Sequence, residues 1–319
     1  MSWKILVSAP YMQPVIDEYL PLLQDSETPV EVVIPPVQER MSEEELLEWI
    51  GDVDGVIAGD DAFTERVMRA APKLKVISKW GTGIDSIDQE AARKLEIAVC
   101  NTPDAFTDAV ADSVMGYILC FARQIPWMDR DIRSGVWRKR AAVALHERTL
   151  GVIGVGHVGQ AVVRRAIAFG MQVLGNDIAP VPAAFVASTG IIMVEKNELL
   201  SQSDFVSINC DLNPTSHHII GSKELELMKS TAYLVNTARG PLIDEAALVT
   251  ALQKQDIAGA GLDVFESEPL SEASPLRTLD NCLLAPHNAN SSPKAYQRVH
   301  ENTIRNLLTE LKRAKERLG

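Results

Sequence analysis

The chain has 319 residues, 46% hydrophobic and 23% charged, which suits a soluble globular protein of two domains. Its formal net charge of −12 disfavours binding to nucleic acid or anionic membranes through bulk charge, because like charges repel. Four widely spaced cysteines form no CxxC pair, which argues against a disulfide framework and a zinc site. The sequence shows no signal-peptide pattern and no apolar run long enough to span a bilayer, so we expect a cytoplasmic protein.

Short apolar runs rich in β-branched residues alternate with helical patterns in the first part of the chain. Buried strands are expected there at Ile5–Ala9, Val30–Ile34, Gly55–Ala58 and Leu74–Ser78. Ser42, followed directly by acidic residues, predicts the start of a helix over residues 42–49. Such alternation is typical of a parallel sheet that is covered by helices.

A second series of alternating strands and helices begins near residue 149. Its strands are expected at Leu150–Gly154, Gln172–Gly175, Asp204–Ile208, Ala232–Asn236, Gly259–Asp263 and Cys282–Pro286. Six parallel strands would form a complete Rossmann sheet. The expected fold class is therefore α/β, with two doubly wound parallel-sheet domains.

Two further segments have helical patterns. Residues 108–125 are apolar at helical spacing and predict a long, largely buried helix that could connect the two domains. Residues 293–319 predict an amphipathic helix with a basic end. The pattern alone leaves open whether this last helix is solvated or returns to the first domain.

The first strand of the second series runs directly into the sequence GVGHVG at 154–159, and a helical pattern follows. A glycine turn between a strand and a helix is typical of dinucleotide binding. Gly154 permits the tight turn, Gly156 lets the backbone approach a pyrophosphate, and Gly159 lets the helix pack closely on the strand. The start of the helix would direct the backbone N–H groups of His157 and Val158 at the phosphates.

Asp177 ends the next strand, at the distance of about twenty residues that the dinucleotide motif requires. Its carboxylate can accept hydrogen bonds from the ribose hydroxyls and would repel a 2′-phosphate. The next residues, Ile178, Ala179 and Pro180, supply no arginine that could bind such a phosphate. We therefore expect NAD rather than NADP. The alternative is a glycine turn that only packs a helix and binds no ligand.

Reactive residue types follow the last three predicted strands: Arg239, Glu268 and His287. Because ligands bind at the carboxyl ends of strands in open α/β sheets, these side chains should lie on one edge. Hydride transfer to a ketone needs a proton donor, and His287 can serve because histidine titrates near neutrality. Glu268 is the best candidate to orient the His287 ring. Arg239 can bind a carboxylate through two parallel hydrogen bonds.

The other histidines carry less weight. His217 and His218 have no Cys, Asp or Glu at metal-ligand spacing, so we expect them to be solvated and expect no metal site. His146 and His300 have no evident partner in the sequence. Neither a GxSxG nor a GxxxxGK[ST] motif occurs, so hydrolase and kinase functions lack support.

Taken in order, the motifs resemble those of the D-isomer-specific 2-hydroxyacid dehydrogenases, and in particular of the phosphoglycerate dehydrogenase-like members. The matching segments are KWGTGID at 79–85, GVGHVG at 154–159, VNTARG at 235–240, GLDVFE at 261–266, EP at 268–269 and APH at 285–287. They span nearly the whole chain. The resemblance also leads us to expect a chain without an appended regulatory domain.

The resemblance implies a domain arrangement and residue roles. A flavodoxin-like substrate domain would comprise residues 1–101 and 288–319, and a Rossmann NAD-binding domain, residues 102–287, would be inserted into it. The family's catalytic residues fall on Arg239, Glu268 and His287. Residues implied to contact the cofactor beyond the glycine turn and Asp177 are Cys210, Pro214, Thr237, Ala238, Asp263 and His287.

The resemblance further implies where the substrate binds. Backbone N–H groups of Gly81, Thr82 and Gly83 would hold the substrate carboxylate together with Arg239, and Asp263 would face the nicotinamide carboxamide. Members of the family are usually homodimers that are joined through the nucleotide domain. Their substrate binds in a cleft between the domains, which closes over it.

Several residues depart from the family pattern near the expected substrate. Asp60 and Asp61 stand where phosphoglycerate dehydrogenases have a loop that holds a phosphate, and two acids there would repel it. Phe106 replaces a small polar residue, and Asn288 begins a run that replaces a glycine-rich one. We therefore expect reversible hydride transfer between NAD(H) and a small 2-oxo or D-2-hydroxy acid, with phosphorylated acids disfavoured. The alternative is an NAD(H)-sensing, corepressor-like binding protein of the same fold.

Overall fold

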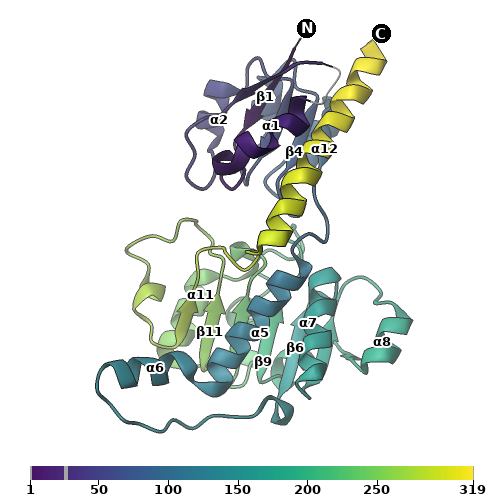
Figure 1. Ribbon diagram of the computed structural model, residues 1–319. Helices are drawn as coiled ribbons and strands as arrows, with labels where there is room; N and C mark the ends of the chain where they lie inside the picture. The colour runs from purple at the N-terminus through teal and green to yellow at the C-terminus, as the bar shows by residue number, and fades with distance from the viewer. Residues whose placement is uncertain (1, 25–27, 319) are drawn as a thin grey trace. The chain divides into compact units, whose positions relative to one another are not determined.

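The computed structural model describes residues 2–24 and 28–318, which divide into two compact units. The first unit comprises Met1–Phe106 and Ser292–Gly319, and the second comprises Thr107–Ser291. Each unit is built on one parallel sheet with helices around it (Figure 1), so the expected fold class is confirmed. The units meet in sequence at 106/107 and 291/292, whereas the resemblance implied 101/102 and 287/288.

The sheet of the first unit has the strand order β2-β1-β3-β4-β5, which is the flavodoxin-like order. Its strands are β1 (Trp3–Val7), β2 (Val30–Val33), β3 (Gly55–Ala58), β4 (Val76–Lys79) and β5 (Ala98–Cys100). Every residue of β3 and β4 is buried. β5 lies outside the strands predicted from the sequence, because three residues are too few to produce a periodic signal.

Helices cover the first sheet. They are α1 (Ile16–Gln24), α2 (Glu43–Trp49), α3 (Glu65–Arg69), α4 (Gln89–Lys94) and α12 (Pro293–Leu318). The helix predicted from Ser42 is confirmed: the Ser42 hydroxyl accepts a hydrogen bond from the Glu45 N–H, and the Glu45 carboxylate accepts one from the Ser42 N–H.

The C-terminal helix α12 packs on the first sheet over β3 and β4 (Figure 1). Its residues Val299, Ile304, Leu307 and Leu311 are buried, and the Ser78 hydroxyl on β4 donates a hydrogen bond to its Thr303 carbonyl. Of the two alternatives left open by the sequence, the return to the first domain is therefore the correct one.

The sheet of the second unit has the order β12-β11-β10-β9-β6-β7-β8, and all its pairings are parallel. Its strands are β6 (Thr149–Ile153), β7 (Gln172–Asn176), β8 (Ile192–Met193), β9 (Phe205–Ile208), β10 (Tyr233–Asn236), β11 (Gly259–Leu262) and β12 (Cys282–Leu284). The strands β8-β7-β6-β9-β10-β11 follow the Rossmann order, and β12 is added at one edge. The edge strand β8 was not predicted, because it has two residues and both are exposed.

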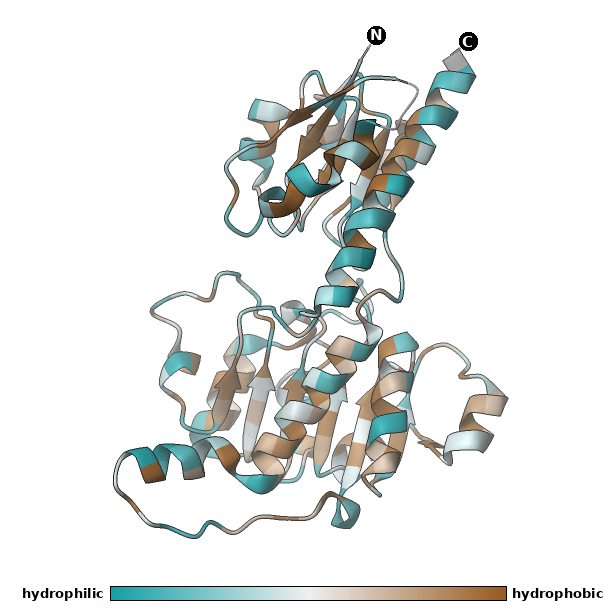
Figure 2. Ribbon diagram, in the orientation of Figure 1, coloured by the Kyte–Doolittle hydropathy of each residue, from teal (hydrophilic) through white to brown (hydrophobic). Residues whose placement is uncertain are grey.

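The helices of the second unit are α5 (Thr107–Arg123), α6 (Ile125–Arg133), α7 (His157–Ala168), α8 (Ala183–Thr189), α9 (Lys196–Gln202), α10 (Ser222–Leu227) and α11 (Glu245–Lys254). The expected long helix after residue 107 is α5, and it buries an apolar face that includes Val114, Ile118 and Phe121. Hydrophobic residues concentrate in the strands and on the helix faces that meet them (Figure 2). Among the described residues, no helix is long and apolar enough to cross a membrane.

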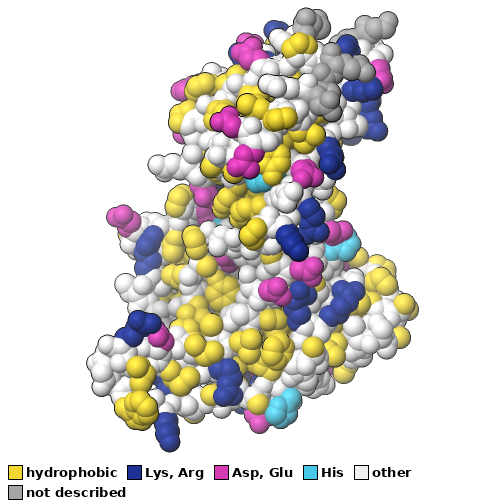
Figure 3. All heavy atoms as spheres, in the orientation of Figure 1, with side chains coloured by type: hydrophobic (Ala, Val, Ile, Leu, Met, Phe, Trp, Pro, Cys, Tyr) yellow, Lys and Arg dark blue, Asp and Glu magenta, His cyan; other side chains and the backbone are white. Residues whose placement is uncertain are grey.

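Exposed apolar side chains gather on α6 and on the segment that follows it (Figure 3). We call them the α6 patch, which consists of Ile125, Ile132, Val136 and Trp137. The Trp137 side chain is 87% exposed. Asp131 is buried at the base of this segment, where Arg140 forms an ion pair with it at 2.9 Å. The ion pair between Asp131 and Arg140 therefore holds the segment that carries Trp137, and the exposed side chains of that segment are apolar.

Candidate active site

The glycine turn lies between β6 and α7, as the sequence predicts. Gly154 has a φ of +85°, and a Cβ there would lie 2.5 Å from the backbone nitrogen of Cys210. A Cβ on Gly159 would lie 2.0 Å from the carbonyl oxygen of Gly154, so the helix can approach the strand only without a side chain. A Cβ on Gly156 would meet no atom within 4 Å. The middle glycine thus faces open space, and the flanking two are required for packing.

Asp177 follows β7 and reaches back to the glycine turn. Its Oδ2 accepts a hydrogen bond of 2.6 Å from the Val155 N–H, and its Oδ1 accepts one of 2.8 Å from the Ala179 N–H. These two bonds fix the orientation of the carboxylate. A carboxylate has about four lone-pair sites, so acceptor capacity remains for a ligand hydroxyl. Ile178 beside it is 90% exposed.

Other predicted cofactor contacts lie at the carboxyl ends of β9 and β10. Cys210 is half-buried, and burial raises its pKa to about 11, so the thiol is neutral. Pro214 is exposed in the loop that follows. Thr237 is 7% exposed, and its hydroxyl has no hydrogen-bond partner within the described part of the chain. The adjacent Ala238 is half-buried, and its N–H donates a hydrogen bond to the Asn236 side chain.

Arg239 begins the short turn after β10 and is half-buried. Its guanidinium donates a hydrogen bond of 2.9 Å to the Ala238 carbonyl, and its own carbonyl accepts one from the Asn236 amide. The next residue is Gly240, where a Cβ would lie 1.9 Å from the Phe265 carbonyl group. Gly240 therefore lets the Arg239 turn pack directly against the segment that leads to Glu268.

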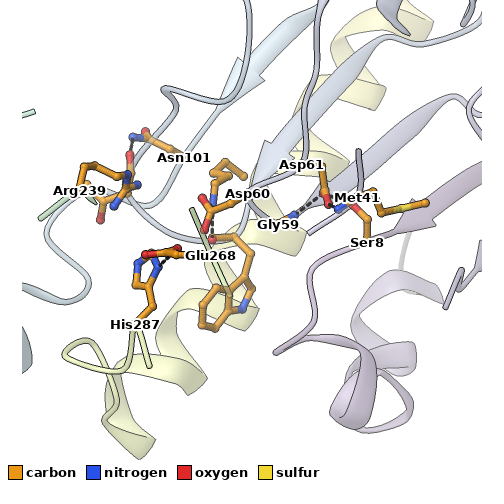
Figure 4. A network of polar contacts seen from close by, with 12 residues as sticks. Ser8, Met41, Gly59, Asp60, Asp61, Asn101, Arg239, Glu268 and His287 are labelled. Carbon is orange, nitrogen blue, oxygen red and sulfur yellow. Dashed lines mark hydrogen bonds and ion pairs between the residues drawn. The ribbon is translucent and has the colours of Figure 1, made fainter. Parts of the chain in front are cut away.

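Glu268 and His287 form a pair, and Figure 4 shows their side chains turned toward each other. The Glu268 Oε2 lies 3.0 Å from the His287 Nδ1, and the Glu268 Oε1 accepts a hydrogen bond of 2.9 Å from the Phe265 N–H. Their side chains are only 16% and 21% exposed. A carboxylate at this distance fixes the orientation of the imidazole ring. The pairing proposed from strand order alone is thus present.

Asp263 supports the turn that carries His287. It is 1% exposed, and its two carboxylate oxygens accept the N–H groups of Asn288 at 2.9 Å and Ala289 at 2.8 Å. Its carbonyl accepts the His287 N–H at 2.7 Å. His287 has a φ of +49°, which is unusual for a residue with a side chain, and these bonds hold it there. Burial raises the pKa of Asp263, while the backbone N–H groups act in the opposite direction.

The predicted substrate loop of the first unit follows β4. Gly81 has a φ of +120°, and its carbonyl accepts a hydrogen bond from the Thr102 N–H. The Thr82 hydroxyl donates to the Thr102 carbonyl at 3.2 Å, and the Thr82 carbonyl accepts from the Asn101 amide. Gly83 follows with no helix or strand around it. The loop is therefore anchored through its carbonyls.

The two acids expected to repel a phosphate point in different directions. Asp61 is 0% exposed, and its carboxylate accepts hydrogen bonds from the Ser8 hydroxyl and from the N–H groups of Gly59 and Met41 (Figure 4). Burial is the main cause that raises its pKa. Asp60 forms an ion pair of 3.1 Å with Lys79, whose side chain is 5% exposed. The expectation that two acids present their charge to a substrate is wrong for Asp61, and Lys79 offsets the charge of Asp60.

Two histidines have partners that the sequence did not reveal. His218 is exposed but not simply solvated, because its Nε2 lies 2.7 Å from the Glu266 carboxylate. His300 is buried and has a partner, since the Trp80 indole donates a hydrogen bond of 2.9 Å to its Nδ1. Each partner lies far away in sequence, and no local pattern could reveal it.

The chain is similar in sequence to known proteins. Residues 115–289 match the model of the D-isomer specific 2-hydroxyacid dehydrogenase NAD binding domain. A glyoxylate reductase of Thermofilum pendens is 42% identical over 278 residues, which cover 85% of this chain and 82% of that protein. A D-3-phosphoglycerate dehydrogenase of Methanocaldococcus jannaschii is 44% identical over 263 residues, which cover 81% of this chain but only 50% of that protein.

The fold also matches solved structures. A D-lactate dehydrogenase from Aquifex aeolicus, complexed with NAD and lactic acid, has a TM-score of 0.86 at 27% identity, and the match covers 98% of this chain and 96% of that one. A glyoxylate reductase from Paecilomyes thermophila has a TM-score of 0.80 at 31% identity, with coverage of 96% and 94%. The strand order, the glycine turn and the family model all identify the second unit as an NAD-binding domain.

Proposed function

The chain belongs to the D-isomer specific 2-hydroxyacid dehydrogenase family, and on that premise we propose that it reduces a small 2-oxo acid to the D-2-hydroxy acid with NADH, reversibly. The observation that carries this proposal is the pair of His287 and Glu268, which lies in the same unit as the glycine turn. The first unit would serve as the substrate domain.

The residues of the second unit fit an NAD molecule. Gly156 faces open space where a pyrophosphate would approach the backbone, and Asp177 keeps acceptor capacity for the ribose hydroxyls. The buried Thr237 hydroxyl has no partner among the described residues and could bond to the cofactor. When bound, NADH supplies the hydride. Asp177 would repel a 2′-phosphate, so we propose that NAD is preferred to NADP.

His287 would act as the general acid in reduction. With Nδ1 held by Glu268, the proton that completes the new hydroxyl would come from Nε2 of the protonated ring. The substrate's carbonyl oxygen would take this proton, and the His287 ring would be left neutral. In the reverse direction the neutral ring accepts the hydroxyl proton. Glu268 stabilises the charged ring in both directions.

Arg239 would bind the carboxylate of the acid. Its planar guanidinium can donate two parallel hydrogen bonds to a carboxylate, and Gly240 fixes the turn from which it projects. In the first unit, the backbone N–H groups of Gly81, Thr82 and Gly83 are the proposed second group of carboxylate donors. The carbonyls of Gly81 and Thr82 accept hydrogen bonds from Thr102 and Asn101, which hold the loop in place.

The substrate would be a small monocarboxylic 2-oxo acid, of which glyoxylate is the first to test, since several relatives are named glyoxylate reductases. The decisive experiment measures NADH oxidation with glyoxylate, pyruvate, hydroxypyruvate and phosphohydroxypyruvate, and repeats it with NADPH. Turnover of at least one acid that is abolished in His287→Ala supports the proposal. Binding of NADH without turnover of any acid would instead favour an NAD(H)-sensing protein.

We further propose that the protein is a homodimer joined through its second unit. The α6 patch supports this, because a tryptophan that is 87% exposed among further apolar side chains is typical of an interface. Sedimentation of the Trp137→Glu variant should then show a monomer. Phe169→Ser is the matched control, because Phe169 is 46% exposed in the same unit and lies outside the patch. A wild-type monomer would refute this assembly.

A further inference from the structure

A hydrogen bond ties the C-terminal helix to the end of β4. The Trp80 indole Nε1–H donates to the His300 Nδ1 at 2.9 Å, and the two residues are 220 positions apart in the chain. Trp80 is 4% exposed and His300 is 5% exposed, so water does not compete for this bond. α12 and β4 lie side by side in Figure 1, and both belong to the first unit.

Trp80 is the last fixed residue before the glycine loop. Its N–H donates to the Ala58 carbonyl at 2.9 Å, and its carbonyl accepts from the Lys79 ammonium at 2.9 Å. Gly81 follows with a φ of +120°, which glycine adopts without the steric cost that a side chain would add. The Gly81 and Thr82 carbonyls anchor the loop to Thr102 and Asn101, and Trp80 fixes the point from which the loop starts.

Aromatic rings pack around the Trp80 indole. Tyr11 stacks on it at a centroid distance of 5.0 Å, Tyr296 meets it edge-on at 5.2 Å, and Phe106 lies at 5.6 Å. Such contacts favour stacked or edge-on arrangements of the rings but do not select the direction of the indole N–H. Among the contacts described for the Trp80 side chain, the bond to His300 is the directional one.

The chemistry of the pair requires a neutral histidine. Indole nitrogen can only donate, so the His300 Nδ1 must accept and the ring proton must sit on Nε2. Tyr19 on α1 and Tyr296 on α12 face the His300 ring, and both are uncharged hydroxyl-bearing rings at neutral pH. An asparagine at 300 could present its carbonyl oxygen in place of Nδ1, whereas a leucine could not.

We propose that His300 is a positioning residue, which acts through Trp80 to fix the Gly81–Gly83 loop for binding the substrate carboxylate. This inference rests on the function proposed above for the loop. It assigns a role in substrate affinity to a side chain on the C-terminal helix that the catalytic chemistry does not use. The loss of one such bond should loosen the loop and leave the His287 pair unchanged.

Steady-state kinetics test the proposal with a matched pair of variants. His300→Leu should raise KM for the 2-oxo acid about fivefold, the factor expected for one net hydrogen bond, with kcat and the KM for NADH within about twofold of wild type. His300→Asn should restore KM to near the wild-type value. Trp80→Phe removes the donor instead of the acceptor and should match His300→Leu. Because these variants alter opposite partners, a folding defect in one does not prevent the test.

Amide hydrogen exchange of the same variants gives a readout that does not depend on catalysis. Exchange at residues 81–84 should be about fivefold faster in His300→Leu and Trp80→Phe, and unchanged in His300→Asn, while the amides of β1 should not respond. If the wild-type protein reduces no 2-oxo acid, the proposed function fails. The exchange rates still show whether His300 positions the Gly81–Gly83 loop. Unchanged exchange, or equal defects in His300→Leu and His300→Asn, would overturn the inference.

Discussion

Replacing Glu268 by glutamine removes the negative charge beside His287 and keeps the size of the side chain. In the structure the two carboxylate oxygens accept separate hydrogen bonds, one from the Phe265 N–H at 2.9 Å and one from the His287 ring at 3.0 Å. An amide has one acceptor oxygen and can satisfy only one of these donors. Either the His287 ring loses its partner, or the Phe265 N–H does.

The size of the effect follows from the bond that is lost. A largely buried, charge-assisted hydrogen bond contributes about 1.5–3 kcal/mol, and the Glu268 side chain is only 16% exposed. If that energy is lost in the transition state, kcat falls roughly ten- to 150-fold. KM for NADH should not change, because Asp177 and the glycine turn are untouched.

The assay follows the loss of NADH absorbance at saturating cofactor with the best 2-oxo acid of the panel. Glu266→Gln is the matched control, because it removes the same charge two residues away, where the carboxylate pairs with His218. This control should keep kcat within about twofold of wild type. If Glu268→Gln retains wild-type kcat, or if both variants lose activity equally, Glu268 does not orient His287.

Three further predictions concern the glycine turn, Asp177 and the C-terminal helix. Gly156→Ala should weaken NADH binding in a fluorescence titration and leave Tm unchanged, whereas Gly159→Ala should lower both, because only the second Cβ meets backbone. Asp177→Asn should lower KM for NADPH about tenfold, since it removes the charge that repels the 2′-phosphate. Burial lowers the pKa of His300 below its ordinary 6.5, so the unfolded chain binds more protons and the free energy of unfolding should fall as pH drops below about 6.5. His300→Asn should remove up to about 1.4 kcal/mol per pH unit of that slope in denaturant titrations.

Each of these has a result that contradicts it. Equal losses of Tm in Gly156→Ala and Gly159→Ala would mean that Gly156 does not face open space. An unchanged NADPH affinity in Asp177→Asn would mean that the carboxylate does not face the ribose. If wild type and His300→Asn lose stability in parallel below pH 6.5, His300 does not titrate as its burial implies.

Much of the second unit follows from the sequence because its signals are local. The glycine turn requires a strand, three glycines and a helix within a few residues, and an acid at the end of the next strand. Arg239, Glu268 and His287 could be grouped without a structure, since carboxyl ends of parallel strands share one edge. The pair of Glu268 and His287 at 3.0 Å bears out that reasoning for two of the three residues. What the sequence determines by itself is therefore the fold class, the glycine turn and the pairing of Glu268 with His287.

Contacts between distant segments were decided only by the tertiary structure. Asp60 and Asp61 are neighbours in sequence, yet one forms an ion pair with Lys79 and the other is buried against Ser8, 53 positions away. Both residues lie in the turn after β3, where no periodic pattern indicates which side chain is buried. The bond from Trp80 to His300 depends in the same way on the register of a helix that returns from the far end of the chain. Composition and periodicity carry no record of such pairings, because they arise only when the packed core brings the segments together.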